Sequence, residues 1–295
     1  MTVTADDGLA LVGTVTLPTG PGPHPAVLLL HGSGRLDRDA NTRRLRMNLG
    51  PTLAAELAKD GIATLRYDRR GVGATAGDWR ATGFVDNRHD AAAALRALAA
   101  RPDIRADAIA VVGHSEGAVH AMSLGAHSDV AAVVLLAGFA RVGEDALRWQ
   151  AGMITRDLPG PVRSLLRAVG LRQLARIRKS SKDKARVAGM PLNVRWIREL
   201  LDHDSRLDLA NIKAPVLAIT GGKDIQVDAA DLDEIRELVP GEAEIHRIPD
   251  LTHVLRRDSA RPSIRAYRHL LRQPVDPDLL TQIADWLTHR LHERP

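Results

Sequence analysis

Ser115 stands between two glycines in the sequence Gly113-His114-Ser115-Glu116-Gly117. Residues 108–112, directly before this segment, are apolar and rich in β-branched side chains, which predicts a buried strand, and residues 118–124 predict a helix. A G-x-S-x-G between a strand and a helix is typical of a nucleophile elbow, a tight and strained turn that lifts the serine hydroxyl out of the sheet. The same pattern occurs in ordinary turns, so the chain must also supply a base, an acid and an oxyanion site.

Two later segments supply a candidate acid and a candidate base. A serine hydroxyl becomes a good nucleophile when a neutral imidazole removes its proton and a carboxylate orients that imidazole. Asp224 follows a strand predicted at 215–220, and His253 follows a strand predicted at 243–248. In a doubly wound sheet such groups meet on the loops beyond the carboxyl ends of the strands. The order Ser115, Asp224, His253 is the nucleophile-acid-histidine order of this architecture.

These residues also have structural interpretations. Asp224 could be an ordinary turn residue, because Gly-Gly-Lys-Asp is good turn chemistry. Asp228 is a rival acid, although the residues after it favour the N-cap of a helix. His253 is one of twelve histidines, most of which we expect to be exposed or structural. Three residues in the required order at three strand ends favour the catalytic interpretation.

The tetrahedral intermediate of such a reaction needs hydrogen-bond donors for its oxyanion. We expect one donor to be the backbone N–H of Glu116, directly after the serine. We expect the second to be the N–H of Ser33, in a Gly-rich segment after a strand predicted at 26–30. A simple Gly-rich turn is the alternative for that segment. His31 and His114 flank the site and are expected to have supporting roles, so neither is our candidate base.

The sequence carries no pattern that indicates a metal or a cofactor. It has no H-x-x-x-H or H-E-x-x-H pair, no G-x-G-x-x-G after the first strand and no G-x-x-x-x-G-K-[ST] loop. The absence of cysteine excludes a thiolate nucleophile, a disulfide framework and cysteine-ligated metals. We therefore expect no metal and no cofactor.

Composition and charge are those of an ordinary globular protein, and the candidate catalytic residues lead us to expect a small-molecule substrate. The 295 residues are 44% hydrophobic and 26% charged, with a net charge of +5. Twelve Arg and Lys against two acids gather between residues 156 and 198, so the rest of the chain is net negative and a nucleic-acid partner is not indicated. No signal peptide or apolar run of membrane-spanning length is visible. We expect a cytoplasmic protein without a membrane partner, and the oligomeric state stays open.

Strands and helices alternate along most of the chain. This order, with nearly continuous apolar strands, predicts an α/β fold with a parallel sheet covered on both faces. A hairpin is expected over residues 2–17. Strands are expected at 26–30, 62–67, 108–112, 130–136, 214–220 and 243–248, and helices at 48–59, 86–100, 228–238 and 275–291.

About 75 residues separate the strand ending near Gly138 from the next one, which is too long for a crossover and predicts an inserted helical lid. The predicted organisation is a core of residues 1–140 and 213–295 with a lid of residues 141–212.

The composition of the lid bears on the substrate. We expect Val162, Leu165 and Leu166, which have helical spacing, to face the pocket and bind an acyl chain. The basic residues of the lid either attract an anionic substrate or form a solvated helix face, and we favour the solvated face. They are Arg167, Arg172, Arg176, Arg178, Lys179, Lys182, Lys184 and Arg186. An aminopeptidase would need an acidic anchor for the substrate amine, and the candidates are Glu199, Asp202 and Asp204.

Five segments together resemble the α/β-hydrolase superfamily, in particular bacterial esterase-like and serine-aminopeptidase-like hydrolases. They are Leu30-His31-Gly32-Ser33-Gly34, Tyr67-Asp68-Arg69-Arg70-Gly71-Val72-Gly73-Ala74-Thr75, the elbow 113–117, Gly222-Lys223-Asp224 and Thr252-His253-Val254. The resemblance implies an eight-stranded, mostly parallel sheet, a lid after the sixth strand, and catalysis by Ser115, Asp224 and His253. Thr75 departs from the usual serine of its loop, and the serine at position 115 disfavours aspartate-nucleophile dehalogenases and epoxide hydrolases.

The residues and the resemblance together predict a cofactor-free serine hydrolase that cleaves a carboxylic ester through an acyl-enzyme. Hydrolysis of a thioester or of an N-terminal amide by the same residues is an alternative that the sequence leaves open. A non-catalytic binding protein on a hydrolase scaffold is a third possibility, although a pure binder has no need of all three catalytic residues.

Overall fold

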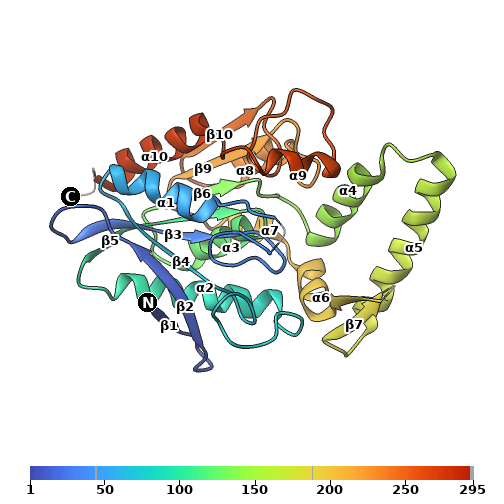
Figure 1. The fold of residues 1–295 in the computed structure, drawn as a ribbon, viewed down its shortest axis with the longest axis horizontal. Coiled ribbons are helices and arrows are strands. Elements are labelled where there is room, and N and C mark those ends of the chain that lie inside the picture. Colours follow the sequence, from blue (N-terminus) through green and yellow to red (C-terminus); the bar gives the residue numbers. More distant parts are fainter. Residues whose placement is uncertain (44, 188, 293–295) are drawn as a thin grey trace.

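The computed structural model describes residues 1–43, 45–187 and 189–292, and its centre is an eight-stranded sheet (Figure 1). The strands lie in the order β1-β2-β4-β3-β5-β6-β9-β10. The β1/β2 and β2/β4 pairs are antiparallel, and every other neighbouring pair is parallel. This confirms the predicted mostly parallel sheet. The strands are β1 (Thr2–Thr4), β2 (Ala10–Thr16), β3 (His24–Leu30), β4 (Ala63–Tyr67), β5 (Ile104–His114), β6 (Ala132–Leu136), β9 (Val216–Gly221) and β10 (Ala243–Ile248).

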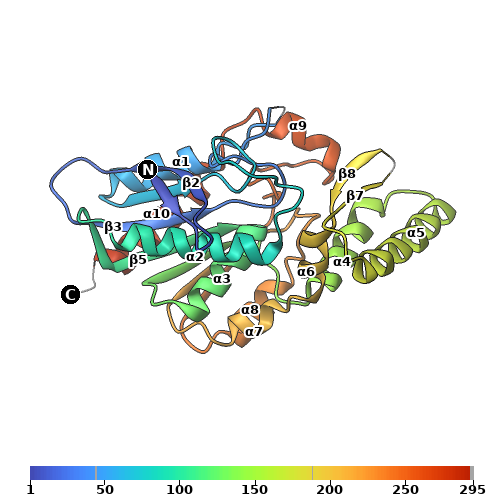
Figure 2. The ribbon, with the colours of Figure 1, turned by 90° about the horizontal axis from the view of Figure 1, so that it is seen from below.

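Helices cover both faces of the sheet (Figure 1 and Figure 2). Successive side chains of a strand point to opposite faces, so Leu28 of β3 packs in one hydrophobic cluster and Leu29 in the other. A strand buried on both faces must be apolar throughout, which explains the continuous apolar runs of the sequence. One face carries α1 (Leu49–Lys59) and α10 (Pro277–His292), and the other carries α2 (Phe84–Ala99), α3 (Glu116–His127) and α8 (Asp231–Leu238).

Residues 141–212 form an insertion between β6 and β9 that extends beyond one end of the sheet (Figure 1 and Figure 2). Its helices are α4 (Gly143–Thr155), α5 (Gly160–Lys179), α6 (Val194–Asp202) and α7 (Ser205–Leu209). It also contains an antiparallel hairpin of β7 (Lys184–Val187) and β8 (Met190–Asn193), which the helical spacing did not predict. At its end, Leu209 packs into the hydrophobic cluster beneath α3.

The predicted acyl-binding residues of the insertion lie on the surface. Val162, Leu165 and Leu166 of α5 are 44%, 64% and 45% exposed, and none of them lines a cavity at the elbow. The prediction that they face the pocket is therefore wrong. Helical spacing puts apolar residues on one face of a helix, but it does not decide what that face meets. It is Ile177, near the end of α5, that is buried against the rest of the insertion.

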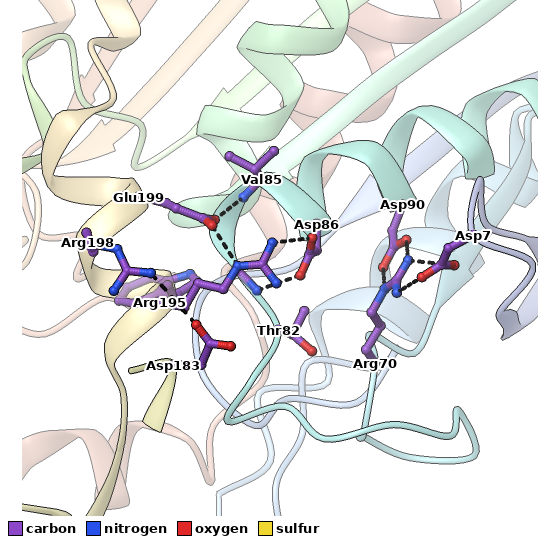
Figure 3. Close-up of polar contacts among 12 residues, drawn as sticks. Asp7, Arg70, Thr82, Val85, Asp86, Asp90, Asp183, Arg195, Arg198 and Glu199 are labelled. Carbon is purple, nitrogen blue, oxygen red and sulfur yellow. Dashed lines mark hydrogen bonds and ion pairs between the residues drawn. The ribbon is translucent and has the colours of Figure 1, made fainter. Parts of the chain in front are cut away.

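The helix α6 is held against the first turn of α2 by a set of charged contacts (Figure 3). Arg195 donates to Asp86 and to Glu199, each at 2.8 Å. Glu199 in turn accepts a 2.8 Å hydrogen bond from the backbone N–H of Val85, one of the amides left free at a helix N-terminus. These contacts fix the position of α6, and with it Trp196, relative to the core.

Candidate active site

Ser115 lies in the sharp turn between β5 and α3, with φ 56° and ψ −120°. This left-handed conformation is strained for a residue with a side chain, and it is the conformation expected of a nucleophile elbow. The glycines two residues before and after Ser115 are needed because there is no room for a side chain at either position. A Cβ at Gly113 would lie 2.1 Å from the carbonyl oxygen of Gly117, and a Cβ at Gly117 would lie 2.2 Å from that of Leu30.

Asp224 and His253 meet at the carboxyl ends of β9 and β10. The Nδ1 of His253 donates to Asp224 Oδ2 at 2.8 Å, and both side chains are almost completely buried. The other carboxylate oxygen, Oδ1, accepts from the backbone N–H groups of Gln226 and Val227. All of these contacts hold Asp224 in one orientation, so the carboxylate fixes both the tautomer and the direction of the imidazole.

Ser115 is linked to His253 through its neighbour His114. The Nε2 of His114 donates to the backbone carbonyl of His253 at 2.9 Å, and the two imidazole rings lie 4.9 Å apart between centroids. Within the described residues, the Ser115 hydroxyl itself makes no hydrogen bond to His253. The structure therefore joins the predicted acid and base directly and places the predicted nucleophile beside them. Such contacts are often longer in unliganded enzymes and tighten when substrate binds.

The two predicted oxyanion donors lie at the same chamber as Ser115. Ser33 and Glu116 line this chamber of about 70 Å³ together with Ser115, and a Cβ on Gly32 would be only 3.2 Å from the Cβ of Ser115. Among the hydrogen bonds between described residues, none is donated by the backbone N–H of Ser33 or of Glu116. Two free amides beside a serine hydroxyl have the chemistry of an oxyanion hole.

The side chain of Glu116 is the centre of a buried polar cluster that the sequence did not reveal. Its Oε1 atom accepts hydrogen bonds from Asn87 Nδ2, His120 Nε2 and Trp196 Nε1 at 3.0–3.2 Å, and Arg69 Nη1 lies 3.1 Å away. Burial acts to raise the pKa of Glu116, but the charge of Arg69 and the hydrogen bond from His120 outweigh it and hold the pKa well below its usual range. Glu116 is therefore a buried carboxylate anion.

Arg69 connects this cluster to the other oxyanion segment. Its Nη2 donates to the backbone carbonyl of His31 at 2.7 Å, two residues before Ser33. One buried guanidinium thus contacts both segments that carry the candidate oxyanion donors.

His31 and His114 are buried and neutral. Burial lowers the pKa of each to about 3, and the positive charge of Arg69 adds to the effect at His31. Each ring has one nitrogen bonded to a backbone carbonyl, which is a supporting role of the kind expected from the sequence.

The other acids considered from the sequence are engaged elsewhere. Asp228 pairs with Arg141, away from His253. Glu199 is held by Arg195 and Val85, Asp202 pairs with Arg178, and Asp204 caps α7 and pairs with Arg206. The carboxylate that does line the cavities is Glu116. Its place after the nucleophile was visible in the sequence, whereas its partners Asn87 and Trp196 follow no motif.

The sheet order, the elbow and the position of the Asp224–His253 pair define an α/β-hydrolase fold. Solved structures of this fold are similar over nearly the whole chain. Est1E from Butyrivibrio proteoclasticus, solved with ferulic acid bound, has a TM-score of 0.70 at 18% identity and covers 99% of this chain and 100% of its own. The Pyrococcus furiosus esterase PF2001 has a TM-score of 0.63 at 16% identity, and the match covers 99% of this chain and 90% of that one. At sequence identities this low, the similarity to these structures supports the fold and nothing finer.

The chain belongs to the family described as serine aminopeptidase, S33, whose sequence profile matches residues 46–260. It is 29% identical over 288 residues to the esterase EstD of Thermotoga maritima. That alignment covers 94% of this chain but only 65% of EstD. It is also 29% identical over 258 residues to the uncharacterized protein Rv2307c of Mycobacterium tuberculosis, covering 85% of this chain and 70% of the relative. The chain is thus an α/β hydrolase of an esterase-like family, and it spans about two thirds of the length of these relatives.

Two further properties concern only residues 1–43, 45–187 and 189–292. No helix there has both the length and the apolar character needed to cross a membrane. No three His, Cys, Asp or Glu side chains gather there in a group that could hold a metal ion. The expectation that no metal and no cofactor take part stays a prediction.

Proposed function

We propose that this protein hydrolyses carboxylic esters through an acyl-enzyme on Ser115. The Ser115 hydroxyl attacks the ester carbonyl while His253 Nε2 takes its proton, and Asp224 holds the imidazole through Nδ1. The N–H groups of Ser33 and Glu116 bind the oxyanion. The tetrahedral intermediate collapses, the alcohol leaves with the proton from His253, and the acyl group stays on Ser115. Water, activated by His253, then releases the carboxylic acid and restores the serine.

The observation that carries this proposal is the buried 2.8 Å contact between Asp224 and His253 at the strand ends next to the elbow. The strained φ of Ser115 and the two free amides beside it support the same assignment. The relationship to EstD favours an ester over other acyl substrates.

We further propose that the insertion acts as a lid. Leu147 and Gln150 of α4 and Trp196 and Leu200 of α6 line the chamber that contains Ser115. A roof of this kind limits which substrates can reach Ser115 and so selects the substrate.

The first experiment compares the turnover of p-nitrophenyl acetate and p-nitrophenyl butyrate by the native protein and by Ser115→Ala. Loss of at least about 1,000-fold in kcat is expected, because the nucleophile is removed. Ser123→Ala, at a buried serine of α3, is the matched control and should keep its activity. Equal rates for native protein and Ser115→Ala would overturn the proposal.

A second experiment separates the remaining possibilities. A fluorophosphonate probe should label the native protein at Ser115 and leave Ser115→Ala unlabelled. Parallel assays with acyl-CoA thioesters and aminoacyl anilides distinguish an esterase from a thioesterase and from an aminopeptidase. Absence of labelling in folded protein would favour a non-catalytic binding protein.

A further inference from the structure

The helix α5 carries an apolar face that the rest of the described chain leaves exposed. Val162, Leu165, Leu166 and Val169 stand at positions i, i+3, i+4 and i+7, so they lie on one side of the helix. Their exposed fractions lie between 44% and 64%. Eleven large apolar side chains are exposed among the described residues, and five of them belong to this one helix. We call these four residues the apolar face of α5.

The helix is held to the insertion through its other end. Leu174 and Ile177, in the C-terminal turns of α5, pack with Val194 and Leu201 of α6. In both views α5 is the outermost element of the insertion (Figure 1 and Figure 2), and none of its residues lines the chamber that contains Ser115. The apolar face is therefore neither a packing surface of the core nor a wall of the proposed active site. A contiguous exposed apolar surface of this kind marks an interaction site.

The same helix is basic along its whole length. Residues 160–179 contain six Arg and Lys and no Asp or Glu. Within the part of the chain that the structure describes, the ion pairs of α5 are those that Arg178 makes with Glu144 and Asp202. The other cations of α5 form no ion pair with a described residue. They are Arg163, Arg167, Arg172, Arg176 and Lys179.

Two of these cations continue the apolar face. Arg172 and Arg176 follow Leu165 and Val169 by seven residues, which is about two turns, so each pair lies on one line along the helix. An arginine side chain can lay its alkyl part along an apolar surface and extend its guanidinium to a phosphate. The face thus presents apolar side chains in its first half and cations in its second.

The charges decide which occupant this face suits. A second copy of the chain, paired through the same face, would bring two sets of cations together without an acid on either helix, and this repulsion opposes the pairing. A bilayer surface with anionic headgroups offers phosphates to the cations and an apolar layer to the leucines and valines.

We propose that α5 docks in the plane of a lipid bilayer surface that carries anionic phospholipids, with the apolar face of α5 below the headgroups and its cations at the phosphates. The inference goes beyond the proposed ester hydrolysis and does not depend on it. The expectation of no membrane partner rests on the lack of a spanning segment, which a helix lying in the interface does not need.

The first test measures co-sedimentation of the full chain with vesicles. One set is phosphatidylcholine alone, and the other is an equimolar mixture of phosphatidylcholine and phosphatidylglycerol. We expect the affinity for the mixed vesicles to be higher by about tenfold or more at low salt, because several cations approach the anionic surface. Added salt should weaken this binding. Equal binding to the two sets, or none to the mixed vesicles, would overturn the proposal.

Matched variants assign the binding to α5. Leu165→Ser should lower the affinity for the mixed vesicles by about fivefold or more, because a leucine no longer enters the apolar layer. Leu207→Ser changes an equally exposed leucine of the insertion, on α7, and should keep the affinity within about twofold. Equal losses in the two variants would overturn the proposal. Circular dichroism checks that each variant is folded.

A second pair of variants separates local from overall charge. Arg172→Gln/Arg176→Gln should lower the affinity for the mixed vesicles by about fivefold or more. Arg236→Gln/Arg247→Gln removes the same charge outside the insertion and should have little effect. Equal losses in the two double variants would show attraction by net charge alone and would overturn the docking of α5.

A fluorescent label reports the depth of the helix directly. The chain has no cysteine, so a single introduced cysteine can be labelled with an environment-sensitive fluorophore. The emission of a label at Leu165→Cys should shift to the blue with mixed vesicles. A label at Ser164→Cys, about 150° around the helix from the centre of the apolar face, should change little.

Two results without lipid would contradict the proposal. A label at Leu165→Cys that is already shielded in the lipid-free monomer would mean that the chain itself covers the face. A dimer in sedimentation velocity that Leu165→Ser abolishes would mean that a second copy covers it. All of these measurements read binding rather than turnover, so their failure leaves the proposed hydrolysis intact, and an inactive protein that docks on vesicles would overturn the hydrolysis alone.

Discussion

Arg69 Nη1 lies 3.1 Å from Glu116 Oε1, and both side chains are buried. The same guanidinium donates to the carbonyl of His31, so it spans the two segments whose N–H groups are the candidate oxyanion donors. A buried ion pair with fixed partners on both sides sets the distance between those segments. We interpret Arg69 as a positioning residue for the oxyanion site.

Replacing Arg69 with Met should lower kcat by about 100-fold with little change in KM, because a displacement of the donors weakens transition-state binding more than substrate binding. It should also lower the free energy of unfolding by about 3 kcal/mol, since Glu116 would remain buried without its counterion. Steady-state kinetics and urea unfolding measure the two effects.

The double variant Arg69→Met/Glu116→Gln distinguishes the role of Arg69 in positioning the oxyanion donors from its role in the stability of the fold. It removes both charges, so most of the lost stability should return while kcat stays low. Recovery of both quantities together would show that Arg69 acts only through folding.

Asp224→Asn should lower kcat by about 10,000-fold while the protein stays folded, because an amide no longer holds the imidazole in the tautomer that accepts the serine proton. Asp228→Asn is the matched control. This rival acid pairs with Arg141 and should keep kcat within about threefold. A large loss in Asp228→Asn with a small loss in Asp224→Asn would reverse the assignment of the acid.

Gly117→Ala should destabilise the protein by about 3 kcal/mol or more, because the added Cβ would lie 2.2 Å from the backbone oxygen of Leu30 and backbone cannot yield easily. Gly170→Ala, in the exposed helix α5, adds a Cβ that meets nothing within 4 Å. It should be neutral or stabilise by up to about 1 kcal/mol, since alanine is the better helix former. Thermal or urea unfolding of both variants checks this, and equal effects would contradict the geometry of the elbow.

The free energy of unfolding should fall as the pH drops below about 6.5. Burial lowers the pKa of His31 and of His114 to about 3 and that of His203 to about 4, whereas an unfolded histidine has a pKa near 6.5. The unfolded state therefore binds more protons between these values, and the stabilisation is complete only above about pH 6.5. Each of these histidines should contribute a slope of about 1.4 kcal/mol per pH unit below about pH 6.

Urea unfolding at several pH values between about 5 and 7 measures this slope. His203→Gln should reduce the slope of the unfolding free energy against pH by the contribution of one histidine. Stability that is flat across this range would contradict the neutral burial of these rings.

The sequence predicted most of the core because its strands and helices carry strong local signals. The helix predicted at 48–59 is observed as α1 (Leu49–Lys59), and the strand predicted at 243–248 is observed as β10 (Ala243–Ile248). The hairpin in the insertion and the short helix α9 (Tyr267–Leu270) were not predicted, since each is brief and has no clear periodicity. The failure at Leu165 has another cause, because its spacing is that of a helix whether or not the apolar face is covered.

The sequence alone predicted Ser115, Asp224 and His253 as the candidate catalytic residues, because parallel strands end at the same edge of a sheet and each of these residues lies at the end of a strand or in the loop that follows it. The contact between Asp224 and His253 and the strained turn at Ser115 are local consequences of that arrangement. The surroundings of Glu116 were decided only by the tertiary structure. Its partners Arg69, Asn87 and Trp196 come from a loop, a core helix and the insertion, and no spacing in the sequence relates them. Burial removes water from this carboxylate, so these few side chains must satisfy it in place of water.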